Sequence, residues 1–126
     1  MSRHAESTLQ QHCVAWFRWQ YPQKYRLLFA IPNGAFLQGD AKQRAMRWAM
    51  LEKEGANKGT ADLLLSIPRG EFHGLYIEIK TPEGRQSDDQ AAFEQAVLAE
   101  GYGYAMPRTF EEFQRVVKSY LETGKY

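Results

Sequence analysis

The segment Leu75–Lys80, of sequence LYIEIK, decides the fold of this chain. Aliphatic and polar residues alternate along it, which predicts a strand with Tyr76, Glu78 and Lys80 together on one face. A Pro-Arg-Gly turn follows the apolar run at 61–67, which is another segment of strand length. The two segments therefore predict an antiparallel hairpin.

Helical and strand patterns alternate through the rest of the sequence. The predicted elements are a helix at 5–20, a strand at 26–31, a helix at about 40–54, a helix from Ser87 to a stop at Gly101, a strand at 102–106 and a helix that begins at Thr109. Capping boxes, Ser87 with Gln90 and Thr109 with Glu112, mark the last two helix starts. The order α-β-α-β-β-α-β-α predicts an α/β fold with a small mixed sheet flanked by helices. Six aromatic residues are expected in the core or at an interface: Trp16, Phe17, Trp19, Phe93, Phe110 and Phe113.

Length and composition are those of an ordinary globular chain. Its 126 residues, 44% hydrophobic and 25% charged, predict one domain over 1–126 and exclude a disordered tail. The single cysteine, Cys13, cannot form an internal disulfide and favours a reducing compartment, and no apolar run is long enough for a membrane span. Residues 1–58 hold nine Lys/Arg and four Asp/Glu, whereas residues 59–126 hold seven and eleven. This asymmetry suits an anionic ligand plus a metal, with local charge compensation as the alternative.

Two carboxylates and one lysine are expected at one end of the hairpin. Asp62 opens the strand at 61–67, and pairing of the two strands can place it next to Glu78. Clustered hard oxygen ligands suit Mg²⁺ or Mn²⁺. A lysine beside such an ion, here Lys80, can orient an attacking water and neutralise charge that develops on phosphorus. The group fits phosphodiester hydrolysis, and the alternative is a solvated sheet face with a cross-strand salt bridge.

These residues are part of a longer series of motifs that resembles the PD-(D/E)xK nuclease superfamily. The series, in chain order, is Glu6 on the first helix, Ile31-Pro32-Asn33-Gly34, Gly59-Thr60-Ala61-Asp62, Glu78-Ile79-Lys80, and Gly84-Arg85 leading to Ser87-Asp88-Asp89-Gln90. Over roughly residues 6–117 it looks like the VRR-NUC branch, in the small stand-alone form of phage and bacterial members. The chain departs from the family at Ala61, where proline is usual; that proline stiffens the start of the strand and is not a ligand.

The resemblance implies a restriction-endonuclease-like α/β fold and metal-dependent DNA cleavage. It implies that Asp62, Glu78 and the main-chain carbonyl of Ile79 bind Mg²⁺ or Mn²⁺. Lys80 then handles the water, Glu6 completes the acidic cluster directly or through water, and Gln90 supports the site from the third helix. It also implies a Holliday junction resolvase that acts on branched DNA as a homodimer, in the cytoplasm of a bacterium or a phage-infected bacterium.

Other interpretations stay open at the level of the sequence. Glu6 can be a helix-start glutamate that favours the helix dipole, and Gln90 is explained by its capping box alone. Six residues are candidate DNA contacts: Asn33, Lys42, Arg44, Arg47, Lys58 and Arg85. A solvated face accounts for the basic residues of the helix at 40–54, and a turn accounts for Asn33. For function, the alternatives are a flap nuclease or nickase of the same superfamily and a non-cleaving DNA-binding module of the same fold.

Overall fold

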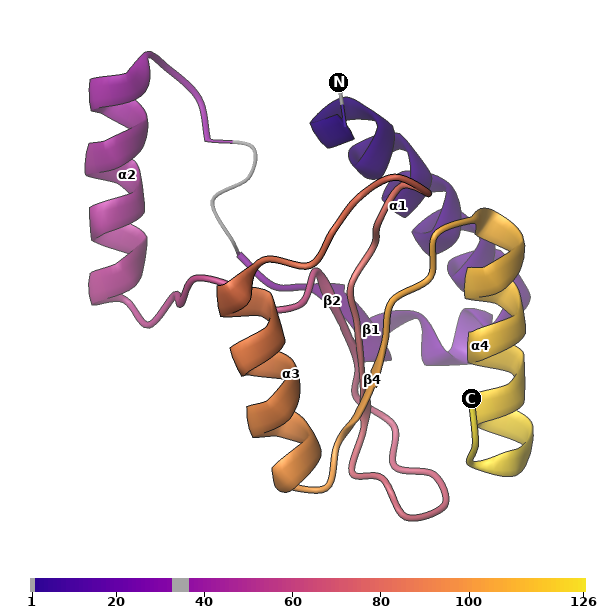
Figure 1. Ribbon diagram of the computed structural model, residues 1–126. Coiled ribbons are helices and arrows are strands. Elements are labelled where there is room, and N and C mark those ends of the chain that lie inside the picture. Colours follow the sequence, from indigo (N-terminus) through magenta and orange to yellow (C-terminus); the bar gives the residue numbers. More distant parts are fainter. Residues whose placement is uncertain (1, 33–36) are drawn as a thin grey trace.

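The computed structural model describes residues 2–32 and 37–126 (Figure 1). Its elements are α1 (Ser2–Gln20), η1 (Pro22–Leu27), β1 (Leu28–Ala30), α2 (Ala41–Lys53), β2 (Leu63–Leu65), β3 (Leu75–Ile77), α3 (Asp88–Ala99), β4 (Gly103–Ala105) and α4 (Phe110–Thr123). The predicted order of helices and strands is confirmed, with the short 3-10 helix η1 as an addition. Within the described residues, no helix is long and apolar enough to span a bilayer.

The strands of the described residues form one mixed sheet in the order β1-β2-β3-β4. Strand β2 is antiparallel to both β1 and β3, and β4 runs parallel to β3. The predicted hairpin is therefore confirmed. Leu63 pairs with Ile77, so the next position outward along the hairpin places Asp62 opposite Glu78.

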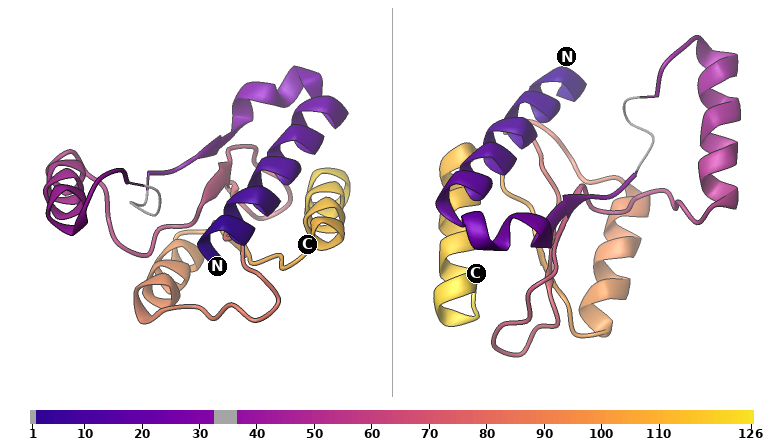
Figure 2. Two further views of the ribbon diagram at one scale, coloured as in Figure 1. Left: turned by 90° about the horizontal axis from the view of Figure 1, so that it is seen from above. Right: turned by 180° about the vertical axis from the view of Figure 1, so that it is seen from behind.

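Helices cover the sheet on both faces (Figures 1 and 2). Helices α1 and α4 lie on one face, and α3 lies on the other. The core lies between the sheet and the first pair: Cys13, Phe17, Leu63, Leu65, Leu75, Ile77, Phe113, Val117 and Tyr120 are fully buried. On the other face, the ring of Phe93 meets the ring of Tyr76 edge-on, with 5.1 Å between centroids. The apolar spacing of α4 thus predicts its buried side, which holds Phe113, Val116, Val117 and Tyr120.

The structure differs from two expectations for the first quarter of the chain, the start of the strand at 26–31 and a place for Trp19 in the core. The strand expected at 26–31 begins only at Leu28, because Pro22 opens a 3-10 helix that extends to Leu27. Proline suits this position, since its fixed φ matches a first helical turn and its missing N–H leaves no donor unpaired. Trp19 is 79% exposed, whereas Phe17 is fully buried. Two residues apart, they lie on nearly opposite sides of a helix with 3.6 residues per turn.

The two expected capping boxes have different outcomes. At the start of α3 the box is complete, because Ser87 and Gln90 each accept a main-chain N–H from the other. At the start of α4, Thr109 accepts the N–H of Glu112, as expected. The carboxylate of Glu112, however, accepts the N–H of Arg108 at 2.7 Å instead of the N–H of Thr109. The Glu112 side chain thus bonds to the residue before the N-cap, whereas in a capping box it would bond to the N-cap residue itself.

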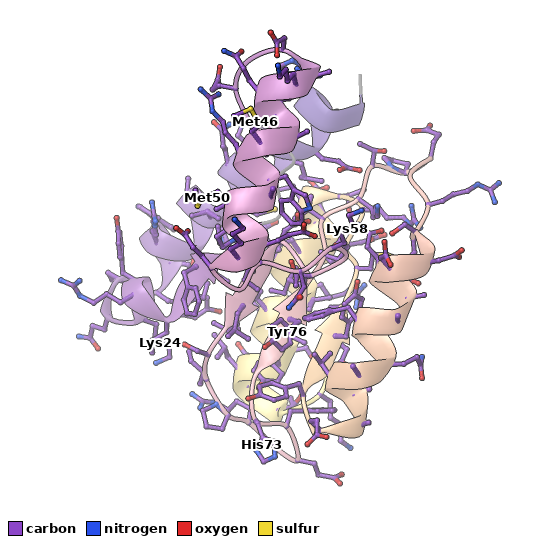
Figure 3. All side chains as sticks on the ribbon, turned by 90° about the vertical axis from the view of Figure 1, so that its left-hand side faces the viewer. Lys24, Met46, Met50, Lys58, His73 and Tyr76 are labelled. Atoms are coloured by element: carbon purple, nitrogen blue, oxygen red, sulfur yellow. The ribbon has the colours of Figure 1, made fainter. Side chains whose placement is uncertain are left out.

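Helix α2 stands apart from the layers (Figure 2). None of its residues 41–53, all of which are described, is buried, and Asp40 caps its start. Met46 and Met50 lie one turn apart on it and are 63% and 57% exposed (Figure 3). The helix therefore leaves an apolar strip without cover from the rest of the described chain.

Candidate active site

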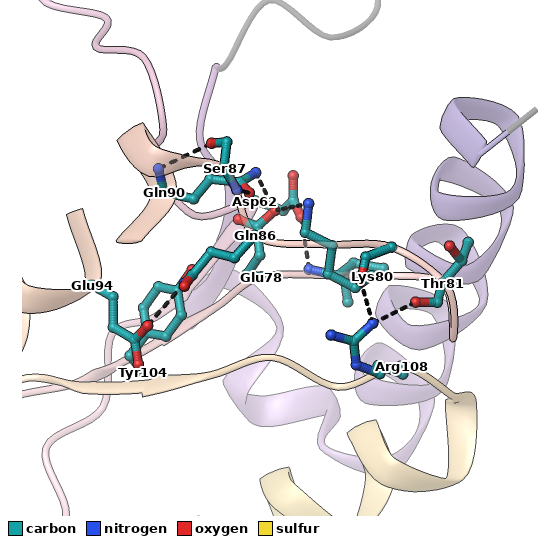
Figure 4. Close-up of polar contacts among 12 residues, drawn as sticks. Asp62, Glu78, Lys80, Thr81, Gln86, Ser87, Gln90, Glu94, Tyr104 and Arg108 are labelled. Carbon is teal, nitrogen blue, oxygen red and sulfur yellow. Dashed lines mark hydrogen bonds and ion pairs between the residues drawn. The ribbon is translucent and has the colours of Figure 1, made fainter. Parts of the chain in front are cut away.

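Four polar side chains converge where β2 begins and β3 ends (Figure 4). Asp62 directly precedes β2, Glu78 directly follows β3, and the antiparallel register brings the two positions opposite each other. A carboxylate oxygen of Asp62 accepts the main-chain N–H of Ile79 at 2.7 Å. This bond holds the aspartate across the hairpin, beside the glutamate. Asp62, Glu78, Lys80 and Gln90 are called the Glu78 cluster below.

Lys80 lies with its ammonium beside Glu78. The distance from Nζ to the glutamate Oε2 is 3.8 Å, and the two residues are only 7% and 2% exposed. The main chain continues along β4 beyond the regular strand: the N–H of Glu78 bonds to Ala105 and the N–H of Lys80 bonds to Pro107. Alternate residues in such an extended segment point the same way, so both side chains reach one site.

Gln90 links α3 to the cluster. Its side-chain Oε1 accepts the N–H of Ser87, and its Nε2 donates to Glu78 Oε2, each at 2.8 Å. The capping role and the contact with the site therefore coexist, because an amide side chain has both an acceptor and two donors. Gly59, at φ +84°, brings the segment before Asp62 against the first turn of α3. A Cβ there would lie 2.4 Å from main-chain atoms of Asp89, so this close approach requires glycine.

The carboxyl group of Glu78 is in an environment that disfavours its charge. Its pKa is raised from 4.5 to about 8, chiefly by burial and then by the negative charge of Asp62, while the positive charge of Lys80 opposes the shift. Its Oε1 is buried and has no hydrogen-bond partner among the described residues. Such a carboxylate is buried, has an unpartnered oxygen and lies beside a second carboxylate. Additional positive charge would therefore stabilise it.

Glu6 lies close enough to act on this site electrostatically. Its charge adds to the upward shift of the pKa of Glu78, as the weakest of four contributions. Among residues 2–32 and 37–126, however, no three His, Cys, Asp or Glu side chains are grouped closely enough to hold a metal ion. The structure therefore does not place Glu6 as a third direct ligand, and a role through water stays a prediction.

The candidate DNA contacts are spread over the surface. Lys58 and Arg85 are exposed in the segments that lead into β2 and α3. Lys42, Arg44 and Arg47 lie on the separate helix α2, where the two arginines donate to the main-chain carbonyls of Gly39 and Gln38. Asn33 lies outside the described residues. The structure thus does not bring the α2 residues into the cluster.

Comparison with solved structures identifies the fold. A structure described as "VRR_NUC domain protein" matches with a TM-score of 0.75 over 93% of this chain and 88% of that chain. This chain has the VRR_NUC fold. The identity is 22%, so the shared architecture is what the match establishes. A search of protein-family models and a search of curated proteins found no match to the sequence.

The donor set at the cluster fits a divalent cation in this VRR_NUC fold. Asp62 and Glu78 offer carboxylate oxygens, the kind of ligand that Mg²⁺ and Mn²⁺ prefer. The unpartnered Oε1 of Glu78 and the raised pKa of that group both indicate a site that a cation would stabilise. The Ile79 carbonyl, which the resemblance assigns as a ligand, stays a prediction.

Proposed function

We propose that this protein is an Mg²⁺- or Mn²⁺-dependent DNA endonuclease that hydrolyses phosphodiester bonds, and that it resolves Holliday junctions as a homodimer. The observation that carries the proposal is the Glu78 carboxylate. It is buried, it lies beside Asp62, it contacts Lys80 and Gln90, and its Oε1 is without a partner among the described residues. The VRR_NUC fold and the order of the motifs support the same function. Junction selectivity rests on the resemblance.

The residues of the cluster have distinct roles in this proposal. Asp62, Glu78 and the carbonyl of Ile79 would hold the ion, which would supply Lewis-acid polarisation of the scissile phosphate. Gln90 fixes the orientation of Glu78 through its Nε2 bond. The ammonium of Lys80 orients the attacking water and stabilises the negative charge that grows on the phosphoryl oxygens. Its burial strengthens this effect, since a charge acts more strongly where water is excluded.

Cleavage assays on DNA of different shapes test this proposal. A labelled four-way junction is incubated with EDTA, Mg²⁺ or Mn²⁺, beside a flap, a duplex and a single strand. We expect paired, symmetric nicks in the junction that require metal and are lost in Asp62→Asn. Asparagine keeps an oxygen for the N–H of Ile79 but removes the charge that a metal needs. Asp88→Asn, an exposed change in the first turn of α3, is the matched control.

The other outcomes separate the alternatives. Cutting of the flap in preference to the junction indicates a flap nuclease, and single nicks without symmetry indicate a nickase. Equal cutting of all four DNAs removes the resolvase assignment. Binding of DNA without cleavage under every metal condition indicates a non-cleaving module of the same fold.

The homodimer is supported by the surface of α2. A symmetric pair of cuts needs two sites related by a two-fold axis, and the exposed strip of Met46 and Met50 is a surface that a second copy can cover. We expect wild-type protein to sediment as a dimer at micromolar concentration and Met46→Glu/Met50→Glu to sediment as a monomer. Glu52→Lys, a charge change on the other side of α2, is the control and stays dimeric. A monomeric wild type, with or without DNA, contradicts the proposal.

A further inference from the structure

One guanidinium nitrogen faces three carbonyl oxygens in the turn that follows Lys80, and Figure 4 shows Arg108 beside Thr81 of this turn. Arg108 Nη1 donates to the carbonyls of Thr81 at 2.8 Å, Pro82 at 3.2 Å and Gly84 at 2.6 Å. The guanidinium makes these charge-assisted bonds, which are stronger than bonds between neutral groups. The turn at 81–84 is therefore tied to the segment between β4 and α4.

The same segment also holds Lys80 itself. The carbonyl of Pro107, next to Arg108, accepts the main-chain N–H of Lys80 at 3.2 Å. The N–H of Arg108 is in turn held by the carboxylate of Glu112, in the first turn of α4. A continuous set of hydrogen bonds thus connects α4, through Arg108 and Pro107, to the main chain of Lys80 and to the turn at 81–84.

The turn packs directly against the stem of that lysine. Gly84 donates its N–H to the carbonyl of Thr81 at 3.0 Å, which closes the turn. A Cβ added at Gly84 would lie 3.3 Å from Cδ of Lys80, tighter than ordinary contact. The turn therefore lies against the buried stem of the lysine whose ammonium is beside Glu78.

We infer that Arg108 is a positioning residue for Lys80: its guanidinium holds the 81–84 turn against the lysine stem and so keeps the ammonium beside Glu78. Arg108 acts through the turn and touches no reacting group. The effect on catalysis rests on the proposed nuclease function, whereas the effect on the turn does not.

Arg108→Gln and Arg108→Lys, with Arg115→Gln as an exposed arginine control on α4, test the inference. The first readout is amide hydrogen exchange of Gly84 without DNA or metal. We expect exchange to be faster by roughly 10-fold or more in Arg108→Gln, because the turn loses its tie to α4. Lysine restores most of the protection, since an ammonium has three N–H donors for the three carbonyls. The control exchanges like the wild type.

The second readout is cleavage kinetics on the DNA that the wild type cuts best. We expect kcat to fall by about 10- to 100-fold in Arg108→Gln, the effect of a misplaced catalytic group, with KM and the salt dependence of binding unchanged. Arg108→Lys recovers most of kcat. If Arg108→Gln does not fold, Arg108→Lys carries both readouts, with a smaller change of the same sign.

The results that overturn the inference differ from those that overturn the nuclease. Unchanged exchange of Gly84 in folded Arg108→Gln removes the positioning role whatever the activity. Weaker DNA binding with a salt slope smaller by about one makes Arg108 a phosphate contact instead and also overturns it. A wild type that cuts no DNA removes the nuclease function, while the exchange experiment still decides whether Arg108 holds the turn.

Discussion

Replacing Lys80 with methionine is expected to lower kcat for DNA cleavage by about 100- to 1,000-fold, the usual effect of removing one group that stabilises transition-state charge. The side chain is buried and its ammonium lies 3.8 Å from Glu78, so a lysine on the protein surface cannot take over its role. Methionine fills the volume of the lysine stem but carries no charge. Because the ammonium acts mainly on charge that develops in the transition state, the Kd for DNA should change little.

Binding and cleavage measured on the same preparation check this expectation. Lys125→Met, an exposed change near the end of the chain, controls for the loss of one positive charge. Cleavage at the wild-type rate by folded Lys80→Met excludes a catalytic role for this lysine. A Kd that rises as much as kcat falls would show that the residue acts in binding.

Glu78→Gln is expected to stabilise the metal-free protein while it abolishes cleavage. In EDTA, the raised pKa of Glu78, about 8 against 4.5, means that the folded state resists ionisation of this group. Below about pH 4.5 the carboxyl is protonated in both the folded and the unfolded chain, so its ionisation does not change the free energy of unfolding. As pH rises from 4.5 to 8 the unfolded chain ionises first, so the contribution of Glu78 lowers the free energy of unfolding. Above pH 8 the penalty is complete, on the order of 2–5 kcal/mol.

Denaturant titrations in EDTA at pH 4.5 and pH 9 measure this difference. Glu78→Gln should be the more stable protein at pH 9 and should lose most of that advantage at pH 4.5. The exposed Glu71→Gln should behave like the wild type at both values. Identical pH dependence in wild type and Glu78→Gln contradicts a buried glutamate whose ionisation opposes folding.

Metal is expected to reverse the comparison. The proposed ligands come together only in the folded state, so Mn²⁺ at 100 times its Kd should add about 2.7 kcal/mol to the stability of the wild type. Glu78→Gln should show little of this gain, because the amide is a poor ligand and removes one of two carboxylates. A rise in Tm of equal size in both proteins would show that the cation binds at a site that does not include Glu78.

The sequence predicted the features that follow local rules. Period-two alternation in the segment 75–80 identified the strand, and the antiparallel register then put Asp62 opposite Glu78. Helical spacing predicted the buried side of α4, and Ser87 with Gln90 predicted the start of α3. These rules involve residues close along the chain or directly across a hairpin, so one sequence is enough to apply them.

Arg108 shows where such rules stop. Nothing in its spacing distinguished it, because its three partners are main-chain carbonyls, which carry no mark in a sequence. They point at one nitrogen only because the turn at 81–84 and the segment after β4 are brought together by the parallel β3–β4 pair.

The sequence by itself determined the order of the elements, the hairpin and the residues that meet at its end. Tertiary structure decided the electrostatics of that end. The burial of Glu78, the upward shift of its pKa and its unpartnered oxygen depend on helices and strands from distant parts of the chain. Local patterns fix which side chains face one way, whereas burial and charge at a site depend on everything packed around it.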